Sequence, residues 1–302
     1  MKIKNKKITF NPIAIILIVL LAVYMLTMIV LLGWTLMTTV KIPNEYSGIL
    51  TGKRNILWFP KEGWAFDNYL TAYEFFYIEI QNKAGEYVEF NILKQFGNSL
   101  LYSVGCSITM TLSSLVMGYA AARFKYKFSE IIYAFVLVTM ALPIVGSMPS
   151  EIAVATNLRI FGTFPGIWIL RASFLNTYFL IFYAQFKMIP KDYTEAAKID
   201  GANPWAVMTQ IITPLASGTT STVFVLAFIG YWNDFQIPMV YLPYNPVAAY
   251  GMYEFQNTAL PKIANTPTRL AGIFLMAAPI VVFYAIFNKK LNVNLSVGGI
   301  KG

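Results

Sequence analysis

Residues 13–39 read "IAIILIVLLAVYMLTMIVLLGWTLMTT" and contain no charged side chain. A helix needs roughly 20 apolar residues to cross the hydrocarbon core of a bilayer, so this run is long enough to do so. A cleaved signal peptide is the competing interpretation, because Lys2, Lys4, Lys6 and Lys7 precede the run. The apolar part of a signal peptide has only roughly 7–15 residues and ends in a small-residue cleavage site, and this run has neither property. We therefore predict an uncleaved first transmembrane helix.

The composition of the whole chain also indicates a membrane protein. Its 302 residues are 57% hydrophobic and 12% charged, whereas soluble domains are about 25% charged. Histidine is absent and Cys106 is the single cysteine. This excludes a Ser-His-Asp triad, a Cys/His zinc or haem site and an internal disulfide. The net charge of +9 would suit a nucleic-acid-binding protein, but basic residues on the cytoplasmic side of a membrane protein explain it more simply.

Uncharged stretches predict an all-α integral membrane protein with six transmembrane helices. After residues 13–39, the expected spans are 97–122, 131–150, 164–186, 217–240 and 270–288. Arg171 interrupts the fourth span, and Asp234 lies in the fifth. The remaining segments are expected to be an N-terminal tail (1–12), a large extracellular loop (40–96), a cytoplasmic loop (187–216) within the transmembrane core (97–288), and a C-terminal tail (289–302).

The distribution of basic residues predicts the orientation. If the N-terminus is cytoplasmic, thirteen Lys and Arg residues lie in cytoplasmic segments and four lie in short external segments and span ends. The long loop 40–96 carries six basic and seven acidic residues. Short cytoplasmic loops of membrane proteins are enriched in basic residues. We therefore expect both termini to be cytoplasmic.

The cytoplasmic loop contains "IPKDYTEAAKIDGANPWAVMTQIITPL" at residues 189–215. Asp192 and Glu195 have the spacing of a capping box, with Asp in the place of Ser or Thr. Asp200 and Gly201 are expected to end this first helix, because glycine readily adopts the left-handed conformation found at helix ends.

A second short helix is predicted to start directly afterwards. Asn203 can cap it, and Pro204 suits the first helical position, where a missing N–H does no harm. Pro214 would mark the return to the membrane. The local pattern therefore predicts a helix-turn-helix, which could be a docking element or an amphipathic connector lying at the membrane surface.

This loop resembles the EAA loop of ABC-importer permeases, whose pattern is E-A-A, three residues, G, nine residues and I-x-L-P. The pattern is present in register at Glu195, Ala196, Ala197, Gly201, Ile211 and Pro214, with Thr213 in place of the usual Leu. Four further stretches are similar to the carbohydrate, maltose-type branch of this binding-protein-dependent family. They are "IDGA" (199–202), "NSLLYS" (98–103), "YWNDFQIPMVYL" (231–242) and the tail "SVGGIKG" (296–302).

The resemblance implies a bacterial inner-membrane permease that imports a sugar or oligosaccharide. The chain has no GxxxxGK[ST] loop to hold ATP phosphates, so the resemblance places ATP and Mg on a partner ATPase and implies no enzymatic activity, cofactor or metal here. The implied partners are a second permease subunit, a dimeric cytoplasmic ATPase, an extracellular solute-binding protein and membrane lipid. The residues implied to couple to the ATPase are Glu195, Ala196, Ala197, Asp200, Gly201 and Ala202.

Two further groups of residues are candidates for function within the membrane. Polar and aromatic side chains suit a path for sugars, which stack on rings and hydrogen-bond to amides. The candidates for this path are Asn98, Tyr102, Tyr231, Trp232, Asn233, Asp234 and Gln236. Asp234 could instead be an interfacial acid that accepts hydrogen bonds from the backbone. Arg171 and Glu151 are expected to form a structural ion pair across the short connection between spans three and four.

Two other classes of function are weaker alternatives. Ion-coupled transporters and channels usually place ionisable residues near the membrane midplane, often on broken helices in matched halves, whereas the charges here are expected near the outer face. An integral membrane enzyme would need clustered carboxylates or a nucleophile with its base, and the sequence shows neither.

Overall fold

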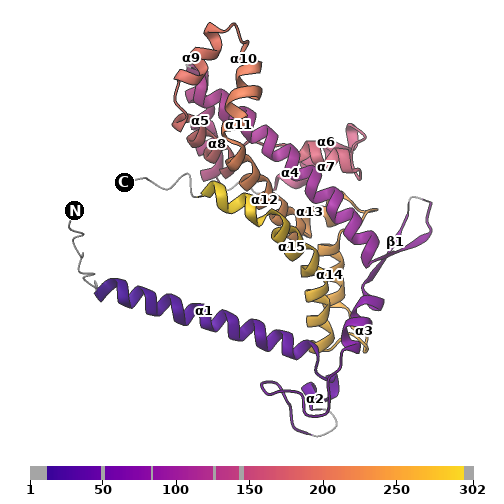
Figure 1. The fold of residues 1–302 in the computed structure, drawn as a ribbon. Helices are drawn as coiled ribbons and strands as arrows, with labels where there is room; N and C mark the ends of the chain where they lie inside the picture. Colours follow the sequence, from indigo (N-terminus) through magenta and orange to yellow (C-terminus); the bar gives the residue numbers. More distant parts are fainter. Residues whose placement is uncertain (1–11, 49–51, 83, 125–126, 143–145, 296–302) are drawn as a thin grey trace, which may run out of the picture. The chain divides into compact units, whose positions relative to one another are not determined.

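The computed structural model describes residues 12–48, 52–82, 84–124, 127–142 and 146–295. The similarity noted at residues 296–302 therefore lies outside the described residues. The described chain is mainly helical, with one two-stranded sheet (Figure 1). It divides into two compact units, Met1–Phe75 with Thr258–Leu275 and Phe76–Asn257 with Met276–Gly302.

The first unit contains α1 (Pro12–Thr39), which matches the predicted first span. At 1.5 Å per residue, its 28 residues extend roughly 42 Å, more than the roughly 30 Å of a bilayer's hydrocarbon core. Every residue from Pro12 to Gly33 is exposed within this chain. This is the surface expected of an apolar helix that faces lipid.

Two short helices follow α1 in the first unit, α2 (Pro43–Ser47) and α3 (Asp67–Phe75). The side-chain amide of Asn68 donates to the main-chain oxygens of Thr39 and Lys41, both at 2.8 Å. These two hydrogen bonds attach the start of α3 to the end of α1.

The second unit begins with an antiparallel hairpin, which corrects the all-α prediction. β1 (Tyr77–Gln81) pairs with β2 (Tyr87–Asn91). Their sequences, YIEIQ and YVEFN, alternate more and less exposed residues with the two-residue period of a strand. In the turn, the Asn82 side-chain oxygen accepts hydrogen bonds from the amides of Ala84 and Glu86 at 2.8 and 3.0 Å. The prediction placed these residues in the large extracellular loop 40–96, without strands.

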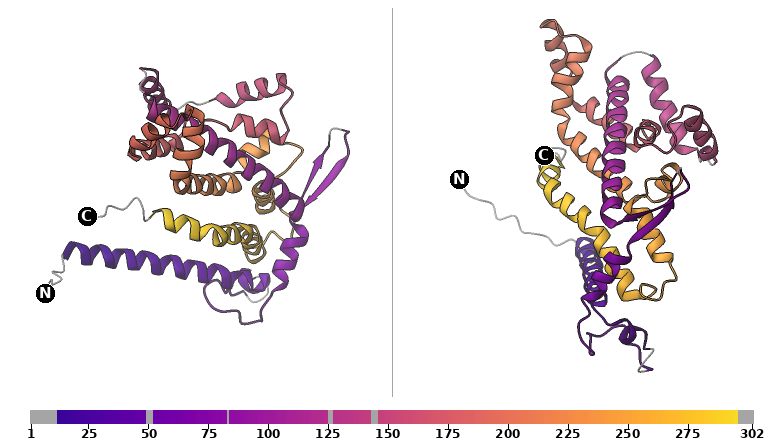
Figure 2. Two further views of the ribbon diagram at one scale, coloured as in Figure 1. Left: turned by 45° about the horizontal axis from the view of Figure 1, so that its top comes forward. Right: turned by 90° about the vertical axis from the view of Figure 1, so that its right-hand side faces the viewer.

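The long helix α4 (Ile92–Arg123) forms the centre of the second unit. It begins five residues before the predicted span 97–122, because the Asn91 side chain caps it by accepting from the Lys94 amide at 3.1 Å. The helices α8 (Thr177–Met188) and α12 (Ser217–Asn233) pack along it (Figure 2).

Three of the predicted spans are each built from two helices. Residues 131–150 fall in α5 (Lys127–Ala141) and α6 (Ser147–Asn157), residues 164–186 in α7 (Phe164–Leu170) and α8, and residues 217–240 in α12 and α13 (Gln236–Tyr241). The last two helices are α14 (Ala248–Asn257) and α15 (Thr266–Leu295).

Polar side chains that accept hydrogen bonds from backbone amides lie at two of these breaks. The Asn176 side chain accepts hydrogen bonds from the amides of Tyr178 and Phe179, which starts α8 as a new helix. Asp234 lies between α12 and α13, and its side chain accepts a hydrogen bond from the Ile237 amide of α13 at 3.2 Å. These two predicted spans are therefore not continuous helices.

Among the described residues, three helices are long and apolar enough to cross a membrane alone. They are Pro12–Thr39, Ile92–Arg123 and Thr266–Ile286. The pair Pro204–Leu215 and Ser217–Asn233, bent by 77°, could count as a fourth. The chain is thus a multi-helix membrane protein, and the count of six spans stays a prediction.

Candidate functional site

The segment between α8 and α12 forms a helical hairpin that projects beyond both helices (Figure 1). We call residues 189–215 the loop hairpin. Its elements are α9 (Asp192–Ile199), α10 (Pro204–Ala206), the π-helical η1 (Val207–Ile212) and α11 (Thr213–Leu215).

The turn of the loop hairpin has the predicted local structure. Gly201 has a φ of +81°, in the left-handed region where a Cβ atom is strained. The Asn203 side-chain oxygen accepts a hydrogen bond from the Ala206 amide at 2.8 Å, and Pro204 is the first residue of α10. These features confirm the helix end at Gly201 and the cap at Asn203.

The predicted capping box at Asp192 is wrong. The Lys191 carbonyl accepts hydrogen bonds from the amides of Thr194 and Glu195, so Lys191 is the N-cap and Asp192 is already the first helical residue. The side chains of Asp192 and Glu195 make no cap hydrogen bond. Within the described chain the Glu195 carboxylate is exposed and has no polar partner, so it is accessible to another protein.

The six residues of the coupling prediction are divided between two faces of the loop hairpin. Glu195, Ala196, Asp200 and Gly201 are exposed. Ala197 is buried and Ala202 is half-buried, and the Ala202 amide donates to the Ala197 carbonyl at 2.9 Å. Ala197 and Ala202 therefore hold the two arms of the loop hairpin together, and the other four residues are exposed.

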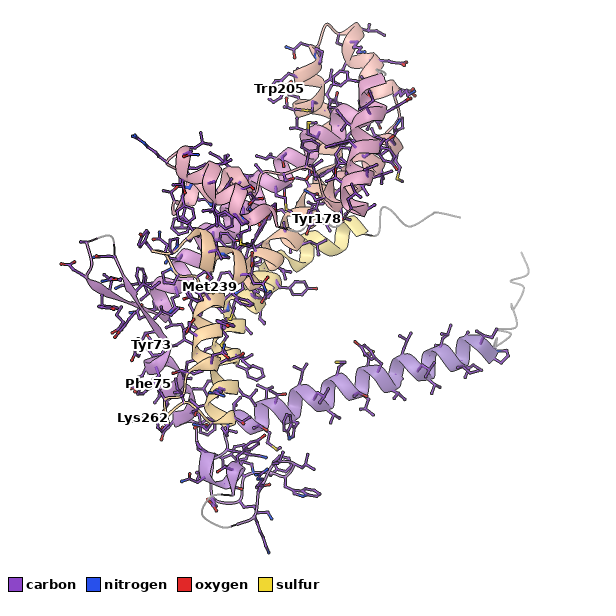
Figure 3. All side chains as sticks on the ribbon, turned by 180° about the vertical axis from the view of Figure 1, so that it is seen from behind. Tyr73, Phe75, Tyr178, Trp205, Met239 and Lys262 are labelled. Atoms are coloured by element: carbon purple, nitrogen blue, oxygen red, sulfur yellow. The ribbon has the colours of Figure 1, made fainter. Side chains whose placement is uncertain are left out.

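Two exposed apolar residues of the loop hairpin were missed by the sequence analysis. Ile199 is 86% exposed and Trp205 is 65% exposed, and Trp205 lies on the loop hairpin in Figure 3. Large apolar side chains that cluster on a surface often mark a protein interface. Their positions on either side of the Gly201 turn, among polar residues, could have indicated from the sequence that both side chains are exposed.

The base of the loop hairpin is packed firmly against the helix bundle. Met208 and Ile212 lie in one buried cluster with Phe186 of α8 and Tyr119 of α4. Beyond this cluster, the Arg123 guanidinium donates to the Ile189 carbonyl at 2.9 Å. The loop hairpin is therefore joined to α4 and α8 by close packing of buried side chains.

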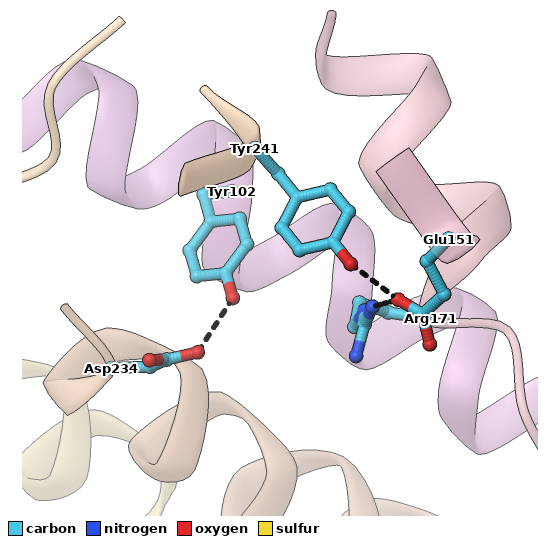
Figure 4. A network of polar contacts seen from close by, with 5 residues as sticks. All are labelled: Tyr102, Glu151, Arg171, Asp234 and Tyr241. Atoms are coloured by element: carbon cyan, nitrogen blue, oxygen red, sulfur yellow. Dashed lines mark hydrogen bonds and ion pairs between the residues drawn. The ribbon is translucent and has the colours of Figure 1, made fainter. Parts of the chain in front are cut away.

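The seven path candidates do not form one surface. The Tyr102 hydroxyl donates to Asp234 Oδ2 at 2.9 Å (Figure 4). The rings of Tyr231 and Tyr102 pack edge to face, with 5.6 Å between their centres. Tyr102 is fully buried, and Trp232 is buried between two phenylalanine rings. Both therefore belong to the interior of this chain.

The other candidates lie closer to the surface. Asn233 and Gln236 are exposed. The half-buried Asn98 donates to the Pro246 carbonyl at 3.0 Å. The Asp234 carboxylate accepts hydrogen bonds from the Tyr102 hydroxyl and from the Ile237 amide. It therefore makes the backbone contact expected of an interfacial acid and, in addition, a contact with a path candidate.

A groove between α4 and α12 was not predicted. It has a volume of about 290 Å³ and is mainly apolar, with three hydroxyl-bearing residues, Thr111, Thr220 and Ser221. The Thr111 hydroxyl has no hydrogen-bond partner.

Arg171 and Glu151 lie together with Tyr241 (Figure 4). Arg171 forms an ion pair with Glu151 Oε2, and the Tyr241 hydroxyl donates to the same oxygen at 2.7 Å. The Arg171 guanidinium also lies 5.4 Å from the centre of the Tyr241 ring. Tyr241 was not among the candidate residues, because nothing in its neighbouring sequence indicates this contact.

One protein family matches the part of the chain that contains the loop hairpin and the Arg171 ion pair. Residues 114–292 match the model of the family described as binding-protein-dependent transport system inner membrane component. The chain belongs to this family. The match includes the loop hairpin, both residues of the Arg171 ion pair and Asp234.

Individual relatives of this transport component cover most of its length. It is 26% identical over 282 residues to the diacetylchitobiose uptake system permease protein NgcG of Streptomyces coelicolor, covering 92% of this chain and 86% of that protein. It is 28% identical over 214 residues to the trehalose transport system permease protein SugB of Mycobacterium tuberculosis, covering 68% and 78%. A chain of the crystal structure of a bacterial ABC transporter involved in the import of the acidic polysaccharide alginate has the same fold, with a TM-score of 0.71, 17% identity and coverage of 94% and 99%.

Membership of the inner membrane component family defines the role of the chain in general terms. The protein is a membrane permease of an ABC importer, and the ATPase is a partner subunit. Among the described residues, no group of three or more Cys, Asp or Glu side chains could hold a metal ion.

Proposed function

We propose that this permease forms one half of the translocation path for a sugar or oligosaccharide. The named relatives support this class of substrate, because they are described as permeases for diacetylchitobiose and trehalose. The groove between α4 and α12 also suits it, since hydroxyl groups beside an apolar wall can bind the polar edge and apolar face of a sugar ring.

We further propose that the loop hairpin couples this path to the ATPase, and its shape is the observation that carries the proposal. It presents Glu195, Ala196, Ile199 and Trp205 to a partner, while its base is fixed to α4 and α8. When a dimeric ATPase closes around ATP, two rigid hairpins seated on it would move together and displace the membrane helices.

The remaining parts of the importer follow from this assignment. The partners are a second permease subunit, a dimeric ATPase that holds ATP and Mg, and an extracellular solute-binding protein. Six spans and cytoplasmic termini would place the loop hairpin on the same side of a bacterial inner membrane as the ATPase. The excess of basic residues in the segments of that side supports this orientation.

Substitution of Glu195 tests the coupling role. An exposed carboxylate without a partner in its own chain is suited to a bidentate pair with an arginine of the ATPase. We expect Glu195→Ala to leave the complex assembled but to separate ATP hydrolysis from uptake. Both rates would be measured in proteoliposomes that contain the complete importer and its solute-binding protein.

Asp192→Ala is the matched control, because Asp192 is also an exposed carboxylate in the first turn of α9. It should keep the wild-type ratio of sugar imported to ATP hydrolysed. An unchanged ratio in Glu195→Ala would remove Glu195 from the mechanism. Uptake that persists without the ATPase and stops when the proton gradient is collapsed would contradict the proposed coupling as a whole.

A further inference from the structure

The segment that follows α1 folds back along the end of that helix. The Trp34 indole donates to the Ile56 carbonyl at 2.9 Å, and the buried Lys41 ammonium donates to the carbonyls of Asn55 and Ile56 at 3.0 and 2.8 Å. Trp34 lies five residues before the end of α1, which is roughly 7.5 Å along the helix axis. Ile56 is therefore level with the last turns of α1 and not beyond them.

A second group of contacts holds the other end of this segment. The Glu45 carboxylate is buried and accepts hydrogen bonds from the amides of Lys61 and Glu62 at 2.8 and 3.3 Å, and from the side chain of Asn55. One carboxylate thus fixes both ends of residues 55–62, and we call these contacts the Glu45 clamp.

The chain is attached to the end of α1 once more after the Glu45 clamp. The Ala65 amide donates to the Val40 carbonyl at 2.8 Å, and Trp64 forms a β-bridge with Lys41. The Trp64 ring stacks on Phe66, with 6.5 Å between the ring centres.

These attachments leave a set of large apolar side chains exposed around the end of α1. We call them the aromatic collar: Leu57, Trp58, Phe59, Trp64 and Phe66, which are between 57% and 72% exposed. The attached backbone on both sides prevents the segment from turning these side chains inward. A surface of this kind needs an apolar partner.

We propose that the aromatic collar lies in the interfacial layer of the bilayer where α1 leaves the membrane, and so sets the depth of α1. Because α1 is roughly 42 Å long and the hydrocarbon core is roughly 30 Å thick, the end turns of α1 lie at the headgroup level. The hydrogen bond from Trp34 to Ile56 brings the collar to that same level. The collar also continues the exposed apolar surface of α1.

The residues around the collar agree with an interfacial position. Trp and other aromatic side chains are enriched at membrane interfaces, where their rings tolerate both lipid and water. Arg54 and Lys61 are exposed on either side of Leu57, Trp58 and Phe59. Long basic side chains beside an apolar surface can reach the headgroups. A soluble protein partner would explain the exposed rings but not their level beside Trp34.

Depth-dependent fluorescence quenching tests the proposal on the full chain. Trp58→Cys and Phe59→Cys, each made in a Cys106→Ser background because Cys106 is the only native thiol, are labelled with an environment-sensitive fluorophore. The protein is placed in phosphatidylethanolamine and phosphatidylglycerol nanodiscs that carry a nitroxide near the headgroup or near the end of the acyl chain. We expect the shallow nitroxide to quench both labels more strongly than the deep one.

Tyr87→Cys in the same background is the matched control, because Tyr87 is an aromatic residue of the β2 strand with a similar exposed fraction, 75%. Its label should be quenched by iodide in water and only weakly by either lipid nitroxide. Labels at 58 and 59 that respond to iodide alone would overturn the proposal. Protection of those labels from iodide by the solute-binding protein or partner permease, without lipid quenching, would also overturn it and identify a protein-docking surface.

Discussion

At the scale of single residues, Arg171 shows how a charge is accommodated inside an apolar stretch. It lies at the C-terminal end of α7, where the helix stops, and not within a continuous helix. Its partner Glu151 also accepts a hydrogen bond from Tyr241. The side chains of Arg171 and Glu151 are only 20% and 37% exposed, so each needs the other to offset the cost of leaving water.

Removing Arg171 should therefore destabilise the protein more than removing both charges. We expect Arg171→Met to cost about 1–3 kcal/mol, because it leaves the Glu151 carboxylate with fewer partners. Arg171→Met combined with Glu151→Gln should recover part of this loss. Thermal unfolding of the single and double variants in detergent would measure the coupling. Strictly additive effects would show that the ion pair does not stabilise the fold.

At the scale of elements, the approach of α8 to α4 depends on a glycine. An added Cβ at Gly118 would lie 2.8 Å from the Cβ of Phe182 and 3.2 Å from the Tyr183 main-chain nitrogen. A Cβ at Gly97, on the same helix, would meet nothing within 4 Å. Gly118 and Gly97 therefore have different structural roles in α4.

Substitution by alanine at the two positions should have opposite effects. We expect Gly118→Ala to destabilise the protein by about 1–3 kcal/mol, because the α8 backbone must move away. Gly97→Ala should be neutral or stabilise it by up to about 1 kcal/mol, since alanine is the better helix former. Unfolding temperatures of the two variants would distinguish these outcomes. Equal shifts would mean that α8 is free to move.

The Glu45 clamp makes the segment after α1 sensitive to pH. Burial alone would raise the pKa of Glu45, but hydrogen bonds from Asn55, Lys61 and Glu62 and the charge of Lys41 hold the pKa below its ordinary value of 4.5. The ionised carboxylate is thus favoured in the folded state. Its contribution to stability is complete above pH 4.5 and is lost as the pH falls through the lower pKa of the folded state.

Hydrogen exchange would detect this loss. We expect protection of the Lys61 and Glu62 amides, both of which donate to Glu45, to decrease as the pH falls below 4.5. In Glu45→Gln the protection should be lower and independent of pH over this range, because the amide does not titrate. A wild-type pH dependence in Glu45→Gln would assign the effect to another group.

At the scale of the whole molecule, the exposed apolar side chains of the loop hairpin indicate that it binds another protein. Ile199 and Trp205 are large apolar side chains on a structure whose interior is already filled. We expect Ile199→Ser combined with Trp205→Ser to weaken assembly with the ATPase, because that interface would lose its apolar contacts.

Co-purification of the ATPase with the permease would measure this assembly. Leu158→Ser is the matched control, because Leu158 is an apolar residue with a similar exposed fraction, 63%, outside the loop hairpin. It should leave the recovery of the ATPase unchanged. Full recovery with the double variant would show that the ATPase binds elsewhere.

Local sequence was sufficient for the features that depend on neighbouring residues. The membrane class and the extent of α1 follow from uncharged apolar runs, because burying charge in hydrocarbon is costly. The turn of the loop hairpin follows from Gly201 and Asn203, since a left-handed φ and an N-cap need only a few adjacent residues. The family itself was recognisable from the EAA pattern.

Features that depend on contacts between distant residues could not be obtained in this way. Tyr102 is buried because α4 lies at the centre of its unit, and its hydroxyl bonds to Asp234, which is 132 residues away in the sequence. The level of the aromatic collar is set by the hydrogen bond between Trp34 and Ile56, which are 22 residues apart. A few neighbouring residues determine where a helix ends. The burial of a side chain and the depth of a segment in the membrane are decided only when separate segments pack together.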